Sequence, residues 1–290
     1  MTTAQIAFLK GHGTENDFVI VPDPDNVIDL PAAAVAALCD RRAGIGGDGL
    51  LRVVRSAAHP EAQELAGEAE WFMDYRNSDG SVAEMCGNGV RVFAHYLQRA
   101  GLVDDGDLAV ATRGGVKRVH LAKNGDITVS MGRAVLPAAG VTVTVGDRAW
   151  PALNVNMGNP HAVAFVEDLA HAGDLLSVPQ FAPASAYPDG VNVEFVVDRG
   201  ERHVAMRVHE RGSGETRSCG TGACAVAVAA ARRDGIDPAL TGEAVTYTVD
   251  LPGGRLQITE LPDGDIEMTG PAVIVAEGTI DGVFQETALS

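Results

Sequence analysis

The sequence has little positive charge, and lysine is especially rare. Lys and Arg together number 22, against 39 Asp and Glu, and the formal net charge is −17. A surface with this balance repels polynucleotides and anionic membranes, so we expect neither as a partner. The few lysines are Lys10, Lys117 and Lys123, and none stands in a recognisable pyridoxal-phosphate setting.

Long hydrophobic runs and a secretory signal are also missing. The densest apolar stretch, residues 223–231, is far shorter than the roughly 20 residues of a membrane span. The first ten residues have neither the basic start nor the apolar core of a signal peptide. We therefore expect a soluble, cytoplasmic protein. Its 290 residues, 46% of them hydrophobic, suffice for one large domain or two smaller ones.

Cysteine is scarce, and several common motifs are absent. The four cysteines, Cys39, Cys86, Cys219 and Cys224, are too few for a disulfide framework and form no Cys-x-x-Cys pair. The sequence has no P-loop and no Gly-x-Gly-x-x-Gly after a strand. No cluster of His and carboxylates has metal-ligand spacing. We expect a protein that works without a metal or an organic cofactor.

The regular elements predict an α+β fold. Short runs rich in Val and Ile, bounded by turn residues, predict strands at 18–22, 50–55, 127–131, 141–147, 192–198, 204–210, 245–250 and 254–260. Helical spacing predicts three helices, at 31–41 with Asp29 as a cap, at about 89–100 and at about 222–234. Many strands with few helices are typical of an α+β protein rather than a doubly wound sheet.

Two segments of the chain resemble each other. Cys86-Gly-Asn-Gly and Cys219-Gly-Thr-Gly each precede a predicted helix. Nine residues before these cysteines stand Asn77 and Glu210, each beside an Arg. We infer two structurally similar halves, residues 1–131 with Cys86 and residues 132–271 with Cys219.

The correspondence extends further upstream. Asn16 and Asn159 each lie in a glycine-containing turn that runs into an apolar strand. Each predicted half therefore carries, in the same order, a turn Asn, a later turn, a Cys and a helix.

The position of the two cysteines predicts reactive thiols. Asn88 and Thr221, two residues after each Cys, are good N-cap types, so free backbone N–H groups should surround each sulfur. Such a setting lowers a thiol pKa and favours anions. One reactive Cys would suggest acyl transfer through a covalent intermediate. Two equivalent thiols on opposite faces of one carbon suggest proton removal by one and delivery by the other, which inverts a stereocentre. A non-catalytic amino-acid binding protein is a third reading.

Several segments resemble the diaminopimelate epimerase family. They are GHGTENDFVI, RNSDGSVAEMCGNGVR, NMGNPHAV, GVNVEFV and ERGSGETRSCGTGACA, in family order over most of the chain. The resemblance implies two pseudo-symmetric halves, each a curved mixed or antiparallel sheet around a central helix, with the active site in the cleft between them. Residues 272–290 would return to the first half. Proline racemases and hydroxyproline epimerases of the same fold are the alternative.

The resemblance also implies an activity and a site. Cys86 and Cys219 would be the acid/base pair that interconverts LL- and meso-diaminopimelate in lysine and peptidoglycan precursor synthesis, in a homodimer. His161 and Glu210 would tune the thiols. The residues expected to bind substrate are Asn16, Asn77, Gly87, Asn88, Asn159, Asn192, Glu210, Arg211, Gly220 and Thr221.

Two places depart from the family pattern. Many members have Gln where this chain has Gly49, so a side-chain contact from that position is absent here. Residues 59–70 match nothing comparable and predict an exposed acidic loop.

Overall fold

The computed structural model describes residues 6–138 and 140–281. The chain forms two compact units, which are Met1–Val129 with Pro271–Ser290, and Ser130–Gly270. The first unit contains β1 (Ile6–Gly13), β2 (Asn16–Pro22), α1 (Ala32–Cys39), β3 (Gly49–Arg55), η1 (Ser56–Ala58), η2 (Gln63–Leu65), β4 (Trp71–Asn77), α2 (Gly87–Arg99), β5 (Gly106–Thr112), β6 (Gly115–Leu121) and β18 (Val273–Ile280). The boundary between the units falls inside β7 (Ile127–Arg133).

The second unit has a similar order of elements. It contains β8 (Val141–Val145), β9 (Arg148–Asn156), β10 (Pro160–Phe165), η3 (Leu169–Ala172), β11 (Gln180–Ala182), η4 (Ala184–Ala186), β12 (Asn192–Gly200), β13 (His203–Glu210), β14 (Gly214–Thr216), α3 (Gly220–Arg233), α4 (Pro238–Thr241), β15 (Val245–Leu251), β16 (Gly254–Glu260) and β17 (Asp265–Gly270).

Strand pairing repeats from one unit to the other. In the first unit β1 and β2 are antiparallel, β2 and β3 parallel, β3 and β4 antiparallel, β4 and β5 parallel, and β5 and β6 antiparallel. In the second unit the same sequence of pairings links β9, β10, β12, β13, β15 and β16. Even the flanking strands correspond, because β18 pairs antiparallel with β1 as β8 does with β9. The internal repeat predicted from the sequence is confirmed.

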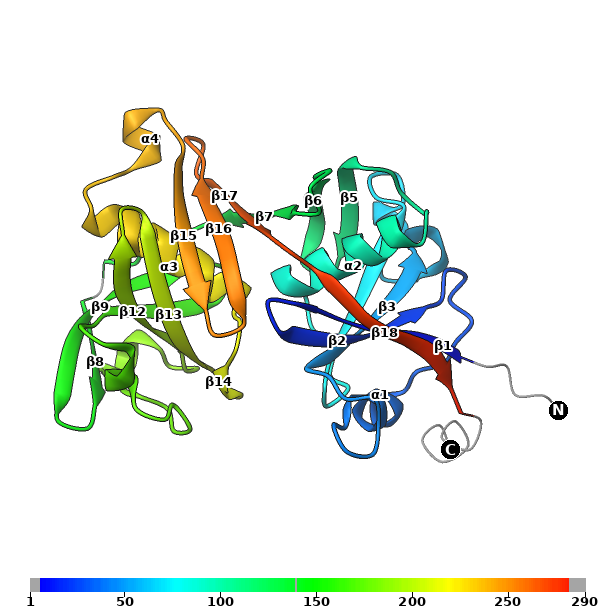
Figure 1. Ribbon diagram of the computed structural model, residues 1–290, viewed down its shortest axis with the longest axis horizontal. Coiled ribbons are helices and arrows are strands. Elements are labelled where there is room, and N and C mark those ends of the chain that lie inside the picture. The colour runs from blue at the N-terminus through cyan, green and yellow to red at the C-terminus, as the bar shows by residue number, and fades with distance from the viewer. Residues whose placement is uncertain (1–5, 139, 282–290) are drawn as a thin grey trace. The chain divides into compact units, whose positions relative to one another are not determined.

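In each unit the strands surround one long helix, as Figure 1 shows for α2 and for α3. Helix α2 contacts β1 to β6 and β18, and α3 contacts β9, β10, β12, β13, β15, β16 and β17. Residues 223–231 of α3 are all buried, since Ala, Val and Cys side chains are small enough for strands to pack closely on every side. The expected α+β fold of two similar halves around central helices is confirmed.

The segment that closes the first unit comes from the far end of the chain. β18 pairs with β1 from Ile6 opposite Ile280 to His12 opposite Val273, and the two strands run side by side in Figure 1. The return expected for residues 272–290 therefore holds for this strand. Residues 282–290 of that segment lie outside the described residues.

The eight predicted strands are all present, and the helix ends differ from expectation. Helix α1 begins at Ala32, and its N-cap residue is Pro31, without a side-chain cap, so the prediction that Asp29 caps it was wrong. Helices α2 and α3 begin two residues earlier than predicted, at Gly87 and Gly220. The apolar strand predicted after Asn159 is present as β10, whereas strands such as β4 and β9 were missed because their mixed residues lack a clear alternation. No helix among the described residues is long and apolar enough to cross a membrane.

The exposed acidic loop expected at residues 59–70 is partly packed against the first unit. Its acidic side chains are exposed, but Ala62 and Ala69 are buried against Phe72 and Ala111 in a small core of their own. The short helices η1 and η2 bring these alanines inward. Arg113 forms a salt bridge with Glu61 that ties the loop to the segment between β5 and β6.

Candidate functional site

Each of the two repeated cysteines caps the central helix of its own unit. The Cys86 Sγ accepts a hydrogen bond from the Gly89 N–H of α2 at 3.5 Å, and the Cys219 Sγ accepts one from the Gly222 N–H of α3 at 3.3 Å. The prediction that Asn88 and Thr221 are the N-caps was wrong, because the sulfurs themselves take the capping position. The thiols therefore lie at the positive end of each helix dipole.

The second glycine of each motif lets neighbouring groups approach the helix. A Cβ added at Gly222 would lie 2.8 Å from Glu194 Oε1 and 3.2 Å from the Cys219 Sγ. At Gly89 it would lie 3.3 Å from a Leu51 methyl group. The repeated Cys-Gly-x-Gly pattern thus has a steric reason in both units, and the contact is the tighter one beside Cys219.

Amide side chains surround Cys86 in the first unit. The half-buried thiol donates to Asn16 Oδ1 at 3.5 Å, and Asn88 Nδ2 donates to the same oxygen at 3.2 Å. Asn16 in turn donates to Asp48 Oδ2 at 2.8 Å. Asn88 is fixed from behind by Arg91, which is fully buried and donates to its Oδ1 at 2.6 Å. Neither Asp48 nor Arg91 was singled out from the sequence.

Asn77 ends β4 and belongs to the turn that leads to Cys86. Its Nδ2 donates to Ser81 Oγ at 3.0 Å, and its Oδ1 accepts from the Tyr75 hydroxyl at 3.2 Å. Gly49, at the start of β3, is its strand partner. A Cβ at Gly49 would lie 2.8 Å from the Tyr75 ring and 2.6 Å from the Arg76 carbonyl oxygen. The ring of Tyr75 therefore fills the space of the side chain that Gly49 lacks.

Charged residues surround Cys219 in the second unit. The thiol is buried, and its Sγ lies 3.6 Å from Thr221 Oγ1. Thr221 Oγ1 accepts from Asn159 Nδ2 at 3.3 Å, and Asn159 Oδ1 lies 3.1 Å from His161 Nε2. His161 and Thr221 thus belong to one hydrogen-bond network beside Cys219.

Two carboxylates shape the electrostatics of this network. Burial raises the pKa of the Cys219 thiol well above its ordinary value, and the charges of Glu210 and Glu194 raise it further, against the hydrogen bonds from Thr221 and Gly222. The prediction of a depressed thiol pKa was therefore wrong for Cys219. Burial likewise raises the pKa of Glu210, although a hydrogen bond from the Thr216 hydroxyl opposes it.

Asn192 and Arg211 lie beside this network with partners of their own. Asn192 Oδ1 accepts from the Arg211 backbone N–H at 2.8 Å. The Arg211 guanidinium donates to the Asp189 carbonyl oxygen at 3.1 Å, whereas Glu210 bonds to Thr216. The carboxylate and the guanidinium that were expected to grip one end of a substrate are thus engaged separately.

Glu194 was missed in the sequence, although a signal was present. It is a charged residue in the otherwise apolar run Val193 to Val197, on the same strand face as Asn192. Its side chain is fully buried, and its Oε1 lies 2.6 Å from His161 Nδ1.

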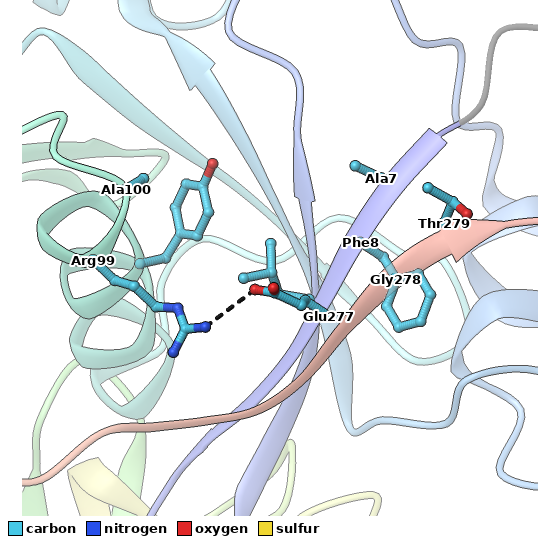
Figure 2. Close-up of a pocket in the computed structure, with 9 residues that line it drawn as sticks. Ala7, Phe8, Arg99, Ala100, Glu277, Gly278 and Thr279 are labelled. Atoms are coloured by element: carbon cyan, nitrogen blue, oxygen red, sulfur yellow. Dashed lines mark hydrogen bonds and ion pairs between the residues drawn. The ribbon is translucent and has the colours of Figure 1, made fainter.

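A surface pocket of about 600 Å³ lies elsewhere in the first unit. Phe8 of β1, Tyr96 and Arg99 of α2, and Glu277 of β18 line it, and Arg99 donates to Glu277 at 3.1 Å (Figure 2). Arg99 ends the 13-residue helix that Cys86 begins, so the pocket is roughly 20 Å from the thiol. The pocket therefore lies at the other end of α2 from Cys86. Among the described residues, no three His, Cys, Asp or Glu side chains gather in a way that could hold a metal ion.

Comparison with solved structures identifies the fold class. The chain resembles a PhzF-family phenazine biosynthesis protein of Bacillus anthracis, with a TM-score of 0.74 and 17% identity over 96% of this chain and all of the other. It also resembles a hydroxyproline epimerase of Agrobacterium vitis, with a TM-score of 0.64 and 13% identity over 97% of this chain and 95% of the other. At these identities the likeness defines the shared two-half fold.

Sequence comparison then identifies the family. The diaminopimelate epimerase family model matches residues 8–137 and 153–275. A curated diaminopimelate epimerase of Streptomyces coelicolor is 79% identical over 99% of this chain and all of its own length. The chain belongs to the diaminopimelate epimerase family, and the family resemblance seen in the sequence and the expected isomerase class are confirmed.

Proposed function

We propose that the protein converts LL-diaminopimelate to meso-diaminopimelate, and the reverse, with Cys86 and Cys219 as its acid/base pair. The observation that carries the proposal is the matched pair of thiols, each the N-cap of the central helix in one of two units with the same strand pairing. Family membership supplies the substrate.

The proposed reaction needs no change of oxidation state. One sulfur, as thiolate, takes the α-proton and becomes a thiol, and the electron pair stays on the substrate as a carbanion. The other sulfur, as thiol, gives its proton to the opposite face of that carbon and becomes a thiolate. The reverse reaction exchanges these roles. Burial and two neighbouring carboxylates favour a neutral Cys219, so Cys219 begins as the proton donor.

The helix ends supply the electrostatic part of the proposal. Free N–H groups at Gly87-Asn88 and Gly220-Thr221 would bind the reacting carboxylate and stabilise the charge that develops as the α-proton leaves. Asn16, Asn77, Asn159 and Asn192 would recognise the substrate through neutral amides, and Glu210 and Arg211 would bind the amino-acid end that does not react. His161 and Glu210 would tune the thiols.

Proton exchange tests the proposal directly. Reduced protein would be mixed with LL-diaminopimelate in D₂O without added cofactor, and the α-proton signal followed by NMR. We expect loss of the signal with formation of the meso isomer, and near-complete loss of both in Cys86→Ser and in Cys219→Ser. Cys224→Ser, which removes a buried thiol inside α3, is the matched control and should stay active.

Other outcomes point to the alternatives. Exchange of L-proline but not of diaminopimelate would keep the two-thiol chemistry and replace the substrate. A covalent intermediate on one Cys, with the other dispensable, would favour acyl transfer. Unchanged ligand binding in both Ser variants, without exchange, would favour a binding protein.

Family membership also motivates the cellular part of the proposal. It comprises a role in lysine and peptidoglycan precursor synthesis, a cytoplasmic location and a homodimer. Light scattering of the purified protein measures the oligomeric state, and a mass of one chain, 30.1 kDa, would contradict the dimer.

A further inference from the structure

Glu194 occupies a place where a charged side chain carries a large cost. It lies on β12, which pairs in parallel with β10, and both Glu194 and His161 are fully buried. The opposite face of β12 carries Val193 and Phe195 into an apolar core. Glu194 instead shares with Asn192 the face that turns toward α3.

Both ring nitrogens of His161 have oxygen atoms as hydrogen-bond partners. Glu194 Oε1 lies 2.6 Å from Nδ1, and Asn159 Oδ1 lies 3.1 Å from Nε2, while Asn159 donates with its Nδ2 to Thr221. Both ring nitrogens therefore face oxygen acceptors. Only an imidazolium donates from both.

The charges around His161 show how a second proton on its ring would affect Cys219. Glu194 and Glu210 both act on Cys219, and an uncompensated pair of buried carboxylates beside a thiol is strongly unfavourable. An imidazolium at His161 offsets part of that charge and acts on Glu210 as well. Tyr187 also senses Glu194, whose charge, after burial, helps raise the pKa of that phenol to about 12.

A neutral residue would fit the space with less cost. Glu194 Oε2 is buried and has no hydrogen-bond partner among the described residues, which is unfavourable for a charged group. A Gln would remove the charge and keep the shape. A buried carboxylate kept at such a cost indicates that its charge is used.

We propose that Glu194 is a positioning residue that holds His161 as an imidazolium beside Cys219. The pair keeps Nε2 directed at Asn159, and through Asn159 at the Thr221 hydroxyl next to the sulfur. The proton on His161 makes the thiolate of Cys219 less costly, both after Cys219 has given its proton as the acid and before it takes one as the base. This role rests on the proposed function, since the structure assigns no substrate to either thiol.

The test reads the protonation of His161 without substrate. The ring nitrogens of ¹⁵N-histidine-labelled protein would be observed by NMR at pH 7.5, and a His161→Gln variant assigns the signal among the eight histidines. We expect both ring nitrogens of His161 to be protonated in the unsubstituted protein and only one in Glu194→Gln. Glu194→Asp, which retains the charge, should keep both protons.

A matched control comes from the same unit. Glu167 forms an exposed ion pair with His171 at 3.3 Å, so Glu167→Gln removes the charge of another Glu–His pair. It should leave the His161 signal unchanged. If the Glu194→Gln variant does not fold, the unsubstituted protein and Glu194→Asp still decide, because a neutral His161 in either overturns the proposal. A doubly protonated His161 in a folded Glu194→Gln variant would overturn it as well.

The pH profile of kcat separates positioning from simple support of the fold. In Glu194→Gln the alkaline limb of α-proton exchange should move to lower pH, and an unchanged profile would contradict the role. If the unsubstituted protein exchanges no α-proton from diaminopimelate, the proposed function fails. The nitrogen signals still decide the protonation of His161 in that case.

Discussion

At the scale of single residues, the two cysteines share a backbone position but differ in their neighbours. Cys86 donates to the amide oxygen of Asn16, which also accepts from Asn88. Cys219 instead lies near the carboxylates of Glu210 and Glu194. A helix N-terminus favours the thiolate of either one. Beside Cys219, burial and negative charge outweigh that effect.

This difference predicts how Cys219 reacts with an alkylating reagent. Because its pKa is raised, its rate of reaction with iodoacetamide should still increase with pH above about pH 9, where the rate of an ordinary thiol levels off. In Glu210→Gln one repelling charge is gone, so the pKa of Cys219 should be lower and the rate at pH 8 should increase several-fold. Mass spectrometry of the Cys219 peptide measures both rates.

The control for this experiment is Glu215→Gln, which changes a glutamate of the same segment that is paired with Arg207 instead. The Cys219 rate should be the same as in the unsubstituted protein. Equal rates in Glu210→Gln and the unsubstituted protein would show that Glu210 does not hold the thiol neutral.

At the scale of elements, the ends of β3 and β4 form one support for the residues around Cys86. Gly49 begins β3 opposite Asn77, the last residue of β4. The Tyr75 ring occupies the space beside Gly49, and its hydroxyl donates to Asn77. Tyr75 and Gly49 together hold Asn77 at the end of β4.

Removing the Tyr75 hydroxyl tests this support. Tyr75→Phe keeps the ring but leaves Asn77 one hydrogen bond short, which should cost about 1 kcal/mol in the orientation of that amide. If Asn77 binds substrate, KM for diaminopimelate should rise about fivefold with kcat little changed. Steady-state kinetics measure both constants.

Tyr96→Phe is the matched control, because Tyr96 lines the pocket at the far end of α2. Its KM should equal that of the unsubstituted protein. An unchanged KM in Tyr75→Phe would show that Asn77, or its hydrogen bond with Tyr75, has no part in substrate binding.

At the scale of the whole molecule, the first unit is completed only when the chain returns to it. β18 pairs antiparallel with β1, and in the sequence it follows the entire second unit. Its Ile280 is buried in the core that contains Val19, Val35 and Leu50. The first unit is therefore built from two segments that are far apart in the sequence, whereas the second unit is one continuous segment.

A truncated chain tests this dependence. A protein ending at Gly270 lacks β18, so the β1 amides that it pairs should lose protection from hydrogen exchange, while those of β12 and β13 keep theirs. A chain ending at Asp281 keeps β18 and serves as the control, with β1 protected. Hydrogen exchange measured by mass spectrometry reports both units in one experiment. Equal protection of β1 in the two chains would contradict the dependence.

The sequence by itself determined the features that depend on short stretches of chain. Glycine turns, apolar strand runs and the Cys-Gly-x-Gly pattern before a helix revealed the repeat, the α+β class and the two thiols, because each arises from neighbouring residues. Only the tertiary structure decided the surroundings of those thiols. Glu194 and His161 are 33 residues apart and meet because β10 and β12 pair in parallel. The raised pKa of Cys219 follows from burial and from the nearby carboxylates of Glu210 and Glu194, which depend on packing between distant segments.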